Sequence, residues 1–226
     1  PTSAGSMNTF ITHPEEEGPH PVVLFLMDAP GKRAELHDMA NRLATAGYYV
    51  MLPNLYYRRV REFKIQESGR DAMHELMASL SNAMVCEDVR SLIEFADQDA
   101  AARDGKLGCV GYCMSGPFAF AAAAAFPDRI AASASFHGVY LYSDRADSPH
   151  LDAEKIKAEM YFGCAETDEY APKEMVDNLE SYLATTNINS RIEWYPGTEH
   201  GFVFPKREGK YHKESAERHW ERLFAL

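Results

Sequence analysis

Apolar residues along the chain alternate between short continuous runs and longer stretches with helical spacing. Val22–Met27 is a continuous apolar run that follows Gly18 and Pro21, a pattern typical of a strand buried on both faces of a sheet. The next stretch, Arg33–Ala46, has apolar residues at positions i, i+3, i+4 and i+7, which indicates an amphipathic helix that ends at Gly47. This pairing of a buried strand with a surface helix recurs along the sequence.

The same alternation continues to the last residues. Further strands are predicted at Tyr48–Leu52, Leu107–Tyr112, Ile130–Phe136, Glu159–Gly163 and Arg191–Tyr195. Further helices are predicted over about Asp71–Leu80, Cys86–Ala96, Ser115–Phe126, Lys173–Ala184 and His212–Leu226, and a long loop over Tyr56–Lys64. Strands and helices that alternate at this spacing predict a three-layer α/β architecture, with a mostly parallel central sheet and helices on both faces.

The composition is that of a folded globular chain. Of 226 residues, 46% are hydrophobic and 25% are charged, close to the averages for soluble domains. The longest apolar runs, Val22–Met27 and Phe118–Phe126, are far shorter than the roughly 18 residues that a membrane span needs. Since no repeat or Pro/Gly/Ser-rich linker divides the sequence, we predict one domain over residues 1–226.

The charge balance is acidic, with 23 Lys and Arg against 34 Asp and Glu and a net charge of −11. Nucleic acids and anionic membranes need a basic surface, so we predict neither as a partner. We expect a small-molecule substrate and a monomer or weak homodimer. The 4 cysteines form no CxxC pair and lack zinc-ligand spacing. Since no signal-peptide pattern is present either, they predict reduced thiols in a cytoplasmic protein that binds no metal.

A cysteine stands where the predicted strand Leu107–Tyr112 meets the next helix. The segment reads Gly111-Tyr112-Cys113-Met114-Ser115-Gly116. Small residues two positions on either side of Cys113 allow the strand and the helix to approach closely, as in a nucleophile elbow. The N-terminus of the helix would favour the thiolate of Cys113. The alternative is a buried structural cysteine, which is the interpretation we favour for Cys109 and Cys86.

A cysteine nucleophile needs a base, and the base needs an acid that orients it. Both are expected in loops that follow strands, with the acid before the histidine in the chain. Of the 9 histidines, His200 and His137 come just beyond predicted strands, and His200 is the leading base. Asp168 is the leading acid, with Glu166 and Glu169 as local alternatives.

With these residues, the sequence resembles the dienelactone hydrolases (carboxymethylenebutenolidases), a branch of the α/β-hydrolase fold with a Cys-Asp-His triad. The resemblance covers about Ser6 to at least Phe202, most of the chain. It is most specific in Gly111–Gly116, Gly163–Asp168 and Tyr195–Phe202. It implies hydrolysis of a small ester or lactone through a thioester acyl-enzyme, without a metal or an organic cofactor.

The resemblance also implies the roles of the catalytic residues. Cys113 would attack the carbonyl carbon, and His200, held by Asp168, would activate water for deacylation. The oxyanion that forms needs two backbone N–H donors. We expect these donors from Met114, directly after the nucleophile, and from Ala29, in the loop after the strand Val22–Met27.

Three further positions match residues that gate the thiol or bind substrate in the family. Asp28 stands where the family has a glutamate that hydrogen-bonds the resting thiol, and the alternative is an Asx turn toward Gly31. Arg70 matches the first of two arginines that bind a substrate carboxylate, and the alternative is a solvated arginine. The second arginine is replaced by Phe204, which implies the loss of one carboxylate anchor and a more apolar pocket wall.

The replacement of this arginine by Phe204 affects which substrates the pocket would accept. Further aromatic candidates for the pocket wall are Tyr57, Phe136, Trp194 and Phe202. We therefore predict a preference for a larger or less charged acyl group, with neutral aryl esters such as p-nitrophenyl acetate turned over faster than dienelactone.

Two functions of other classes are the alternatives. A catalytically silent domain that binds a small molecule or a partner would be favoured by the loss of a triad residue, and none is missing. A thiol-redox or metal protein would need a second cysteine close to Cys113, and Cys109 lies too far along the strand and turn for the two thiols to meet.

Overall fold

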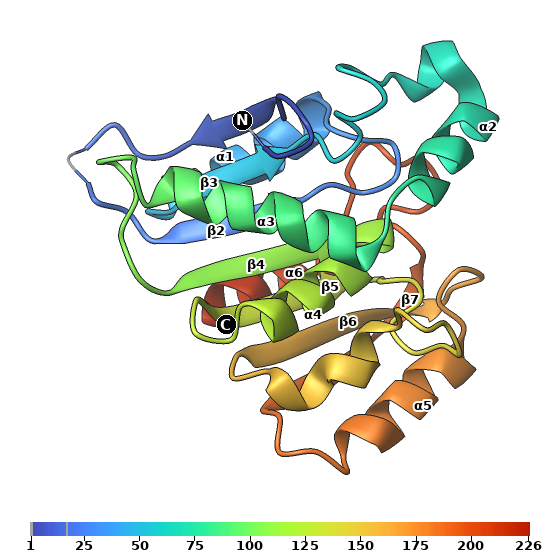
Figure 1. Cartoon of the computed structure of the whole chain (residues 1–226). Coiled ribbons are helices and arrows are strands. Elements are labelled where there is room, and N and C mark those ends of the chain that lie inside the picture. Colours follow the sequence, from blue (N-terminus) through green and yellow to red (C-terminus); the bar gives the residue numbers. More distant parts are fainter. Residues whose placement is uncertain (1, 17) are drawn as a thin grey trace.

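Seven strands form one mostly parallel sheet in the computed structural model, which describes residues 2–16 and 18–226 (Figure 1). The strands are β1 (Thr9–Thr12), β2 (Val22–Leu26), β3 (Tyr49–Pro53), β4 (Leu107–Tyr112), β5 (Ile130–Phe136), β6 (Glu159–Thr167) and β7 (Ser190–Glu199). Their order across the sheet is β1-β3-β2-β4-β5-β6-β7. Neighbouring strands are parallel, except that β1 is antiparallel to β3.

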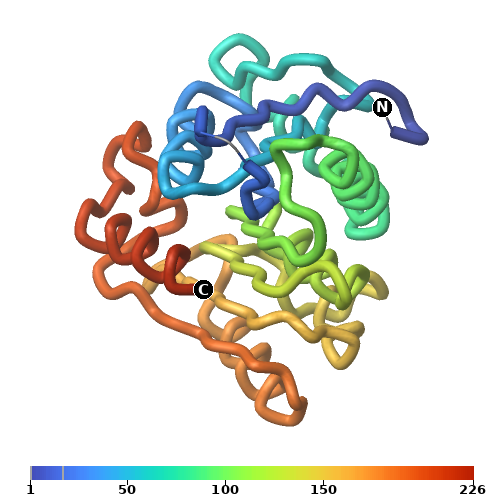
Figure 2. The backbone as a smooth tube through the Cα atoms, turned by 90° about the vertical axis from the view of Figure 1, so that its left-hand side faces the viewer, coloured from blue at the N-terminus to red at the C-terminus, as the bar shows by residue number. Residues whose placement is uncertain are grey.

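Helices cover both faces of this sheet. They are α1 (Ala34–Thr45), α2 (Ile65–Ala78), α3 (Asn82–Ala96), α4 (Gly116–Ala125), α5 (Lys173–Leu183) and α6 (Lys213–Ala225), with 3₁₀ segments η1 (Cys113–Ser115) and η2 (Pro149–Lys155). In Figure 1, α3 and α4 lie in front of the sheet and α1 and α6 behind it, and Figure 2 shows the two layers on opposite sides. An ion pair between Arg42 of α1 and Glu217 of α6, 2.6 Å long, joins the rear helices. The prediction of a three-layer α/β fold is confirmed.

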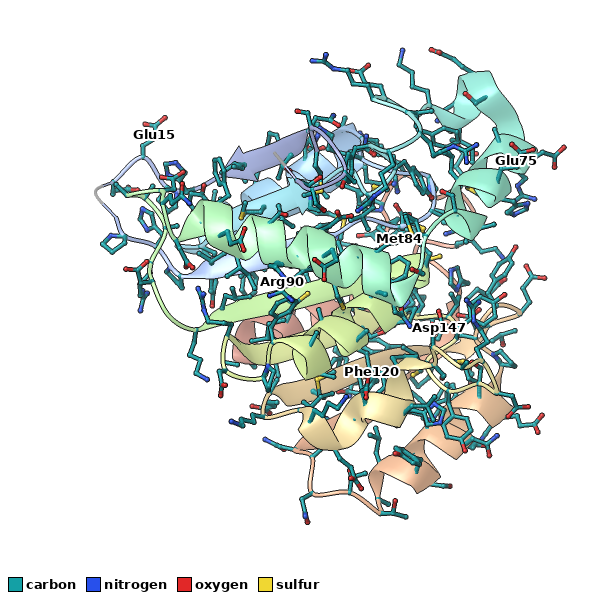
Figure 3. The ribbon with its side chains drawn as sticks, in the orientation of Figure 1. Glu15, Glu75, Met84, Arg90, Phe120 and Asp147 are labelled. Carbon is teal, nitrogen blue, oxygen red and sulfur yellow. The ribbon has the colours of Figure 1, made fainter. Side chains whose placement is uncertain are left out.

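The central strands are buried on both faces. All five residues of β2 are buried, which explains its uninterrupted apolar sequence. On the front face, Phe120 of α4, marked in Figure 3, packs edge-to-face on Phe162 of β6 with ring centroids 5.2 Å apart. On the rear face, His219 of α6 packs on Phe136 of β5 at 4.4 Å. Among the helices of the described ranges, none is both long and apolar enough to cross a bilayer.

Two elements differ from the sequence-based expectation. The hydrophobic pattern does not predict β1, because this edge strand of 4 residues is only half-buried and owes its conformation to pairing with β3. α2 begins at Ile65, directly after the predicted loop and before the predicted start at Asp71. Gly69, with a φ of 83°, interrupts the helix between these two positions. The periodic pattern therefore identified only the part of α2 that follows the break.

Candidate active site

The turn between β4 and α4 holds Cys113 in a backbone conformation that few side chains adopt. Its φ is 55°, in the left-handed region, where a residue other than glycine is strained by about 1–3 kcal/mol. The close approach of strand and helix requires glycine at position 111, because a Cβ there would lie 2.0 Å from the carbonyl oxygen of Ser115. A sharp strand-to-helix turn of this kind is the geometry of a nucleophile elbow.

His200 and Asp168 come from the ends of β7 and β6, which are neighbours in the sheet, and each is the first residue after its strand. The Nδ1 atom of His200 lies 2.7 Å from Oδ2 of Asp168. The other carboxylate oxygen accepts hydrogen bonds from the backbone N–H groups of Tyr170 and Ala171, at 2.9 and 3.0 Å. These bonds hold the carboxylate in one orientation, and through it the imidazole.

The imidazole of His200 connects this carboxylate to the cysteine. The side chain of Cys113 acts on the pKa of this ring, as does that of Asp168. Burial lowers the pKa of His200, but the hydrogen bond to Asp168 and the interactions with Cys113 and with the Asp168 charge outweigh burial and raise the pKa to about 9. An imidazole with this pKa holds a proton at neutral pH, which suits a base that has accepted the proton of a thiol.

The two alternative acids do not contact the imidazole. Glu166 is exposed, and its carboxylate accepts a hydrogen bond of 2.7 Å from the backbone N–H of Gly197. Glu169 is exposed as well. Among the contacts of the described residues, Asp168 is the one carboxylate of the three that reaches His200.

The remaining cysteines do not join the site. All four cysteines are free thiols, and Cys109 and Cys164 are buried. Burial raises the pKa of Cys86 to about 11 and that of Cys164 to about 12. Such thiols stay protonated at neutral pH and are poor nucleophiles. Within residues 2–16 and 18–226, no cluster of three or more His, Cys, Asp or Glu side chains is arranged to hold a metal ion.

A third residue contacts both Ala29 and Met114, the expected oxyanion donors. Both are buried. The hydroxyl of Tyr56 donates a hydrogen bond of 2.8 Å to the carbonyl oxygen of Ala29 and lies 3.2 Å from Sδ of Met114. Sequence reasoning gave Tyr56 no role, because the spacing of residues in a loop does not reveal which other loops it contacts.

Asp28 has a partner that neither sequence-based interpretation included. Its side chain is 1% exposed and forms a bidentate ion pair with the guanidinium of Arg33, with Nη2–Oδ2 at 3.1 Å. Burial raises the pKa of Asp28, and the charge of Arg33 opposes that rise. In the described part of the chain, the carboxylate hydrogen-bonds neither the Cys113 thiol nor the Gly31 amide, and the latter bonds the Asp28 carbonyl oxygen at 2.9 Å.

Neither of the two predicted substrate-binding positions lines the cavity described below. Arg70 is an exposed residue of α2. Phe204 is fully buried, with the guanidinium of Arg33 5.3 Å above its ring. The other aromatic candidates do not line the cavity described next, and two of them, Phe136 and Phe202, are also fully buried.

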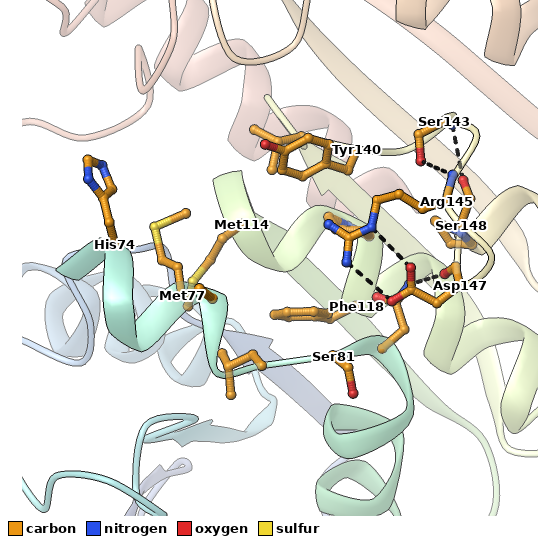
Figure 4. A pocket seen from close by; sticks show the side chains of 16 residues that line it. His74, Met77, Ser81, Met114, Phe118, Tyr140, Ser143, Arg145, Asp147 and Ser148 are labelled. Carbon is orange, nitrogen blue, oxygen red and sulfur yellow. Dashed lines mark hydrogen bonds and ion pairs between the residues drawn. The ribbon is translucent and has the colours of Figure 1, made fainter. Parts of the chain in front are cut away.

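A cavity of about 410 Å³ opens beside the elbow, between α2, α4 and the loop after β5 (Figure 4). Its apolar lining includes Met77, Met114, Phe118, Val139 and Tyr140. Arg145 also lines the cavity, and its guanidinium is paired with the carboxylate of Asp147 at 3.0 Å. Because Met114 directly follows Cys113, the cavity begins next to the nucleophile position. Sequence reasoning missed this lining because its residues come from three separate segments.

A second histidine packs against the triad. The ring of His137, the other histidine that follows a predicted strand, is 1% exposed and lies 4.8 Å from the ring of His200. Burial, together with the charge of His200, lowers the pKa of His137 well below its ordinary value. His137 is therefore neutral and packs against the imidazole of His200 without acting as a second base.

The chain is similar to known proteins over nearly its whole length. The model of the dienelactone hydrolase family matches residues 7–226. A "Putative carboxymethylenebutenolidase" of Synechocystis sp. is 26% identical, over 96% of this chain and 89% of its own. A protein of the same name from Escherichia coli K12 is 25% identical, over 99% and 82%.

Solved structures share the fold. The crystal structure of a "Putative Dienelactone Hydrolase" from Klebsiella pneumoniae superposes with a TM-score of 0.86. The alignment covers 98% of both chains at 23% sequence identity. At this identity the superposition shows that the two chains have the same fold.

Proposed function

Because the chain belongs to the dienelactone hydrolase family, we propose that it cleaves small esters or lactones through an acyl-enzyme on Cys113. Family membership makes it a hydrolase of the class that acts on esters or lactones. The observation that carries the proposal is Cys113 at a strained strand-to-helix turn, together with an imidazole, that of His200, which is hydrogen-bonded to Asp168 and whose pKa responds to Cys113. A nucleophile, a base and an orienting acid are the three groups that covalent acyl transfer requires.

Before substrate binds, the proton of the Cys113 thiol rests on His200, whose raised pKa favours the imidazolium at neutral pH, and acylation begins from the thiolate. The sulfur attacks the carbonyl carbon of the substrate, so that a C–S bond forms and the carbonyl electron pair moves to oxygen. The N–H groups of Met114 and Ala29 stabilise this oxyanion. As the oxyanion collapses, the C–O bond to the alcohol breaks, and His200 donates its proton to the leaving oxygen.

Deacylation repeats these steps with water in place of the thiol. His200 accepts a proton from the water, and the hydroxide oxygen attacks the thioester carbonyl. The C–S bond then breaks, the acid is released, and the proton remains on His200 beside the thiolate. Asp168 keeps Nδ1 of His200 protonated in both half-reactions, so the other ring nitrogen faces the reacting atoms.

The proposed substrate carries an uncharged apolar group. The cavity beside Met114 has an apolar part formed by residues such as Met77 and Phe118, and the guanidinium of Arg145 in its lining is already paired with Asp147. Neither Arg70, which is exposed, nor Phe204, which is buried, offers a carboxylate anchor in the lining. These features support a higher kcat/KM for p-nitrophenyl acetate than for dienelactone, and the opposite order would contradict the proposed preference.

Mass spectrometry of the protein mixed with an activated ester tests the mechanism. We expect an acyl adduct on Cys113 in the wild type, and no adduct in Cys113→Ala. In His200→Ala we expect turnover to fall by about 10⁴-fold. Cys86→Ala is the matched control, because it removes a thiol outside the site, and it should keep wild-type turnover. Equal turnover in the wild type, Cys113→Ala and His200→Ala would contradict the proposal and leave a catalytically silent domain.

A further inference from the structure

The two oxyanion donors belong to separate loops whose positions relative to each other must be fixed. Ala29 follows β2 and Met114 follows β4, and these strands are neighbours, with Leu26 opposite Gly111. The sheet therefore brings the loops side by side. Its pairing ends before the donors, however, so their final positions depend on contacts between side chains. Backbone donors stabilise an oxyanion strongly only when their geometry is fixed before the reaction.

Tyr56 supplies such a contact to both loops at once. It comes from a third loop, after β3, and is 1% exposed. Its hydroxyl carries one proton, and the Ala29 carbonyl, 2.8 Å away, is a stronger acceptor than the thioether of Met114 at 3.2 Å. The hydroxyl therefore hydrogen-bonds Ala29 and packs against the Met114 sulfur.

Tyr56 is itself held rigidly. Its backbone N–H donates to Oδ1 of Asn54 at 3.1 Å, and Nδ2 of Asn54 donates to the carbonyl oxygens of Val60 and Arg61, each at 3.0 Å. The ring packs edge-to-face on Phe63. Burial raises the pKa of the Tyr56 hydroxyl, and negative charge at Asp28 and Cys113 raises it further. Tyr56 is therefore a fixed, protonated donor and cannot serve as a base.

Other side chains hold the rest of the Ala29 loop. The Ser115 hydroxyl donates to the carbonyl oxygen of Met27 at 2.5 Å, and Arg33 binds the Asp28 carboxylate and the Gly31 carbonyl oxygen, the latter at 3.1 Å. In the described part of the chain, the hydrogen bond to the Ala29 carbonyl comes from Tyr56. Loss of that hydroxyl would release the Ala29 peptide while the residues around it stay restrained.

We propose that Tyr56 is a positioning residue whose hydroxyl aligns the Ala29 and Met114 segments, so that their two backbone amides converge on the oxyanion. This inference rests on the proposed function, because it assigns Tyr56 to the oxyanion site of that reaction. Tyr56 does not touch the reacting atoms. It acts through the two peptide groups that do.

The test is the Tyr56→Phe variant, which keeps the ring and removes only the hydroxyl. We expect kcat for p-nitrophenyl acetate to fall by about 10- to 100-fold with little change in KM, since one oxyanion donor alone contributes about 10²- to 10³-fold. The Ki of a trifluoromethyl ketone should rise by a similar factor, because the thiol adds to its carbonyl and leaves an oxyanion at the same place. Tyr49→Phe is the matched control, because its hydroxyl bonds Asp99 at 2.6 Å and Tyr49 is the first residue of β3, at the other end of that strand, and it should keep wild-type kcat.

Alkylation of Cys113 by iodoacetamide separates positioning from damage to the site. This reaction needs the sulfur and His200 but forms no oxyanion, so its rate in Tyr56→Phe should equal that of the wild type. Wild-type kcat and ketone Ki in Tyr56→Phe would overturn the inference and leave the proposed function intact. A parallel loss of alkylation and turnover would also overturn it, since the defect would then not be specific to the oxyanion. Absence of turnover in the wild type would overturn the proposed function, and the inference with it.

Discussion

Cys113 combines backbone strain with a hydrogen-bonded imidazole. Its positive φ is tolerated because the turn is fixed on one side by β4 and on the other by the start of α4. The carboxylate of Asp168 determines the orientation of the neighbouring His200 ring. Two backbone amides in turn hold that carboxylate in place. The reactivity of the cysteine therefore depends on residues that do not touch it.

We expect Asp168→Asn to lower kcat by about 10⁴-fold, because the amide no longer holds His200 in the required tautomer. The substitution removes the hydrogen bond that contributes most to the raised pKa of His200, so that pKa should fall from about 9. Steady-state kinetics and an NMR titration of the imidazole measure the two effects. Glu169→Gln, at an exposed carboxylate beside it, should change neither. An unchanged titration in Asp168→Asn would contradict the assignment of the acid.

At the scale of elements, the junction of β4 and α4 and the docking of α6 on the sheet shape the site. The junction has no room for a side chain at Gly111. α6 is anchored by His219, which is fully buried. Its Nδ1–H donates to the Ala216 carbonyl oxygen at 3.0 Å, and its Nε2 accepts the hydroxyl proton of Tyr112 at 2.8 Å. Since Tyr112 immediately precedes Cys113, this helix supports the elbow from behind.

Gly111→Ala should destabilise the fold by about 3 kcal/mol or more, because overpacking against backbone cannot be relieved by a side-chain rotation. Gly108→Ala is the control in the same strand. A Cβ at position 108 would meet its nearest atom, a methyl group of Val23, at 3.7 Å, which is an ordinary contact. Urea unfolding of both variants measures the difference. Equal free energies of unfolding would contradict the tight junction.

The anchoring histidine should make stability depend on pH. Burial lowers the pKa of His219 to about 3, against an ordinary 6.5. Below pH 6.5 the unfolded chain binds a proton that the folded chain does not, so stability present above pH 6.5 is lost as the pH falls toward 3. Between pH 6.5 and 4.5 the loss from His219 is about 2–3 kcal/mol. Urea unfolding at several pH values measures the effect. The free energy of unfolding should depend less steeply on pH in His219→Gln, and as steeply as in the wild type in the exposed control His74→Gln.

At the scale of the whole molecule, ion pairs join segments that are far apart in the chain, and their burial decides their effect. Asp88 of α3 is fully buried and accepts two hydrogen bonds of 2.7 Å from Arg58, in the loop that carries Tyr56. The pair between Arg42 and Glu217 joins α1 to α6, but both partners are more than 40% exposed. The first pair fixes a loop of the active site against the helical layer, and the second lies in water.

We expect Asp88→Asn to cost about 3–5 kcal/mol of folding free energy, because it leaves the largely buried guanidinium of Arg58 without a counter-charge. Glu217→Gln makes the same chemical change in the exposed pair and should cost about 0–1 kcal/mol. Chemical denaturation of the two variants compares them directly. A similar small loss in both would show that the Asp88 pair does not lock the loop.

Much of the fold could be predicted, because burial on both faces of a sheet imposes continuous apolar runs, and one-sided burial imposes helical spacing. The apolar pattern missed β1 because this strand is only half-buried and depends on pairing with β3. It missed the first turn of α2 because that turn is mostly exposed and is separated from the periodic part by Gly69. The residues of the proposed triad could be selected from features that are local in sequence as well. The elbow is a contiguous motif, and loops after parallel strands meet at one edge of the sheet.

The sequence by itself determined the alternation of elements, the strand-to-helix turn at Cys113 and the order in which acid and histidine follow it. Only the tertiary structure decided that Asp28 pairs with Arg33, that Phe204 lies in the interior and that Tyr56 bridges two loops. Turns and periodic patterns act between residues close in sequence, so they can be predicted from it. The partner of a loop side chain depends on the packing of several segments at once, which local patterns do not encode.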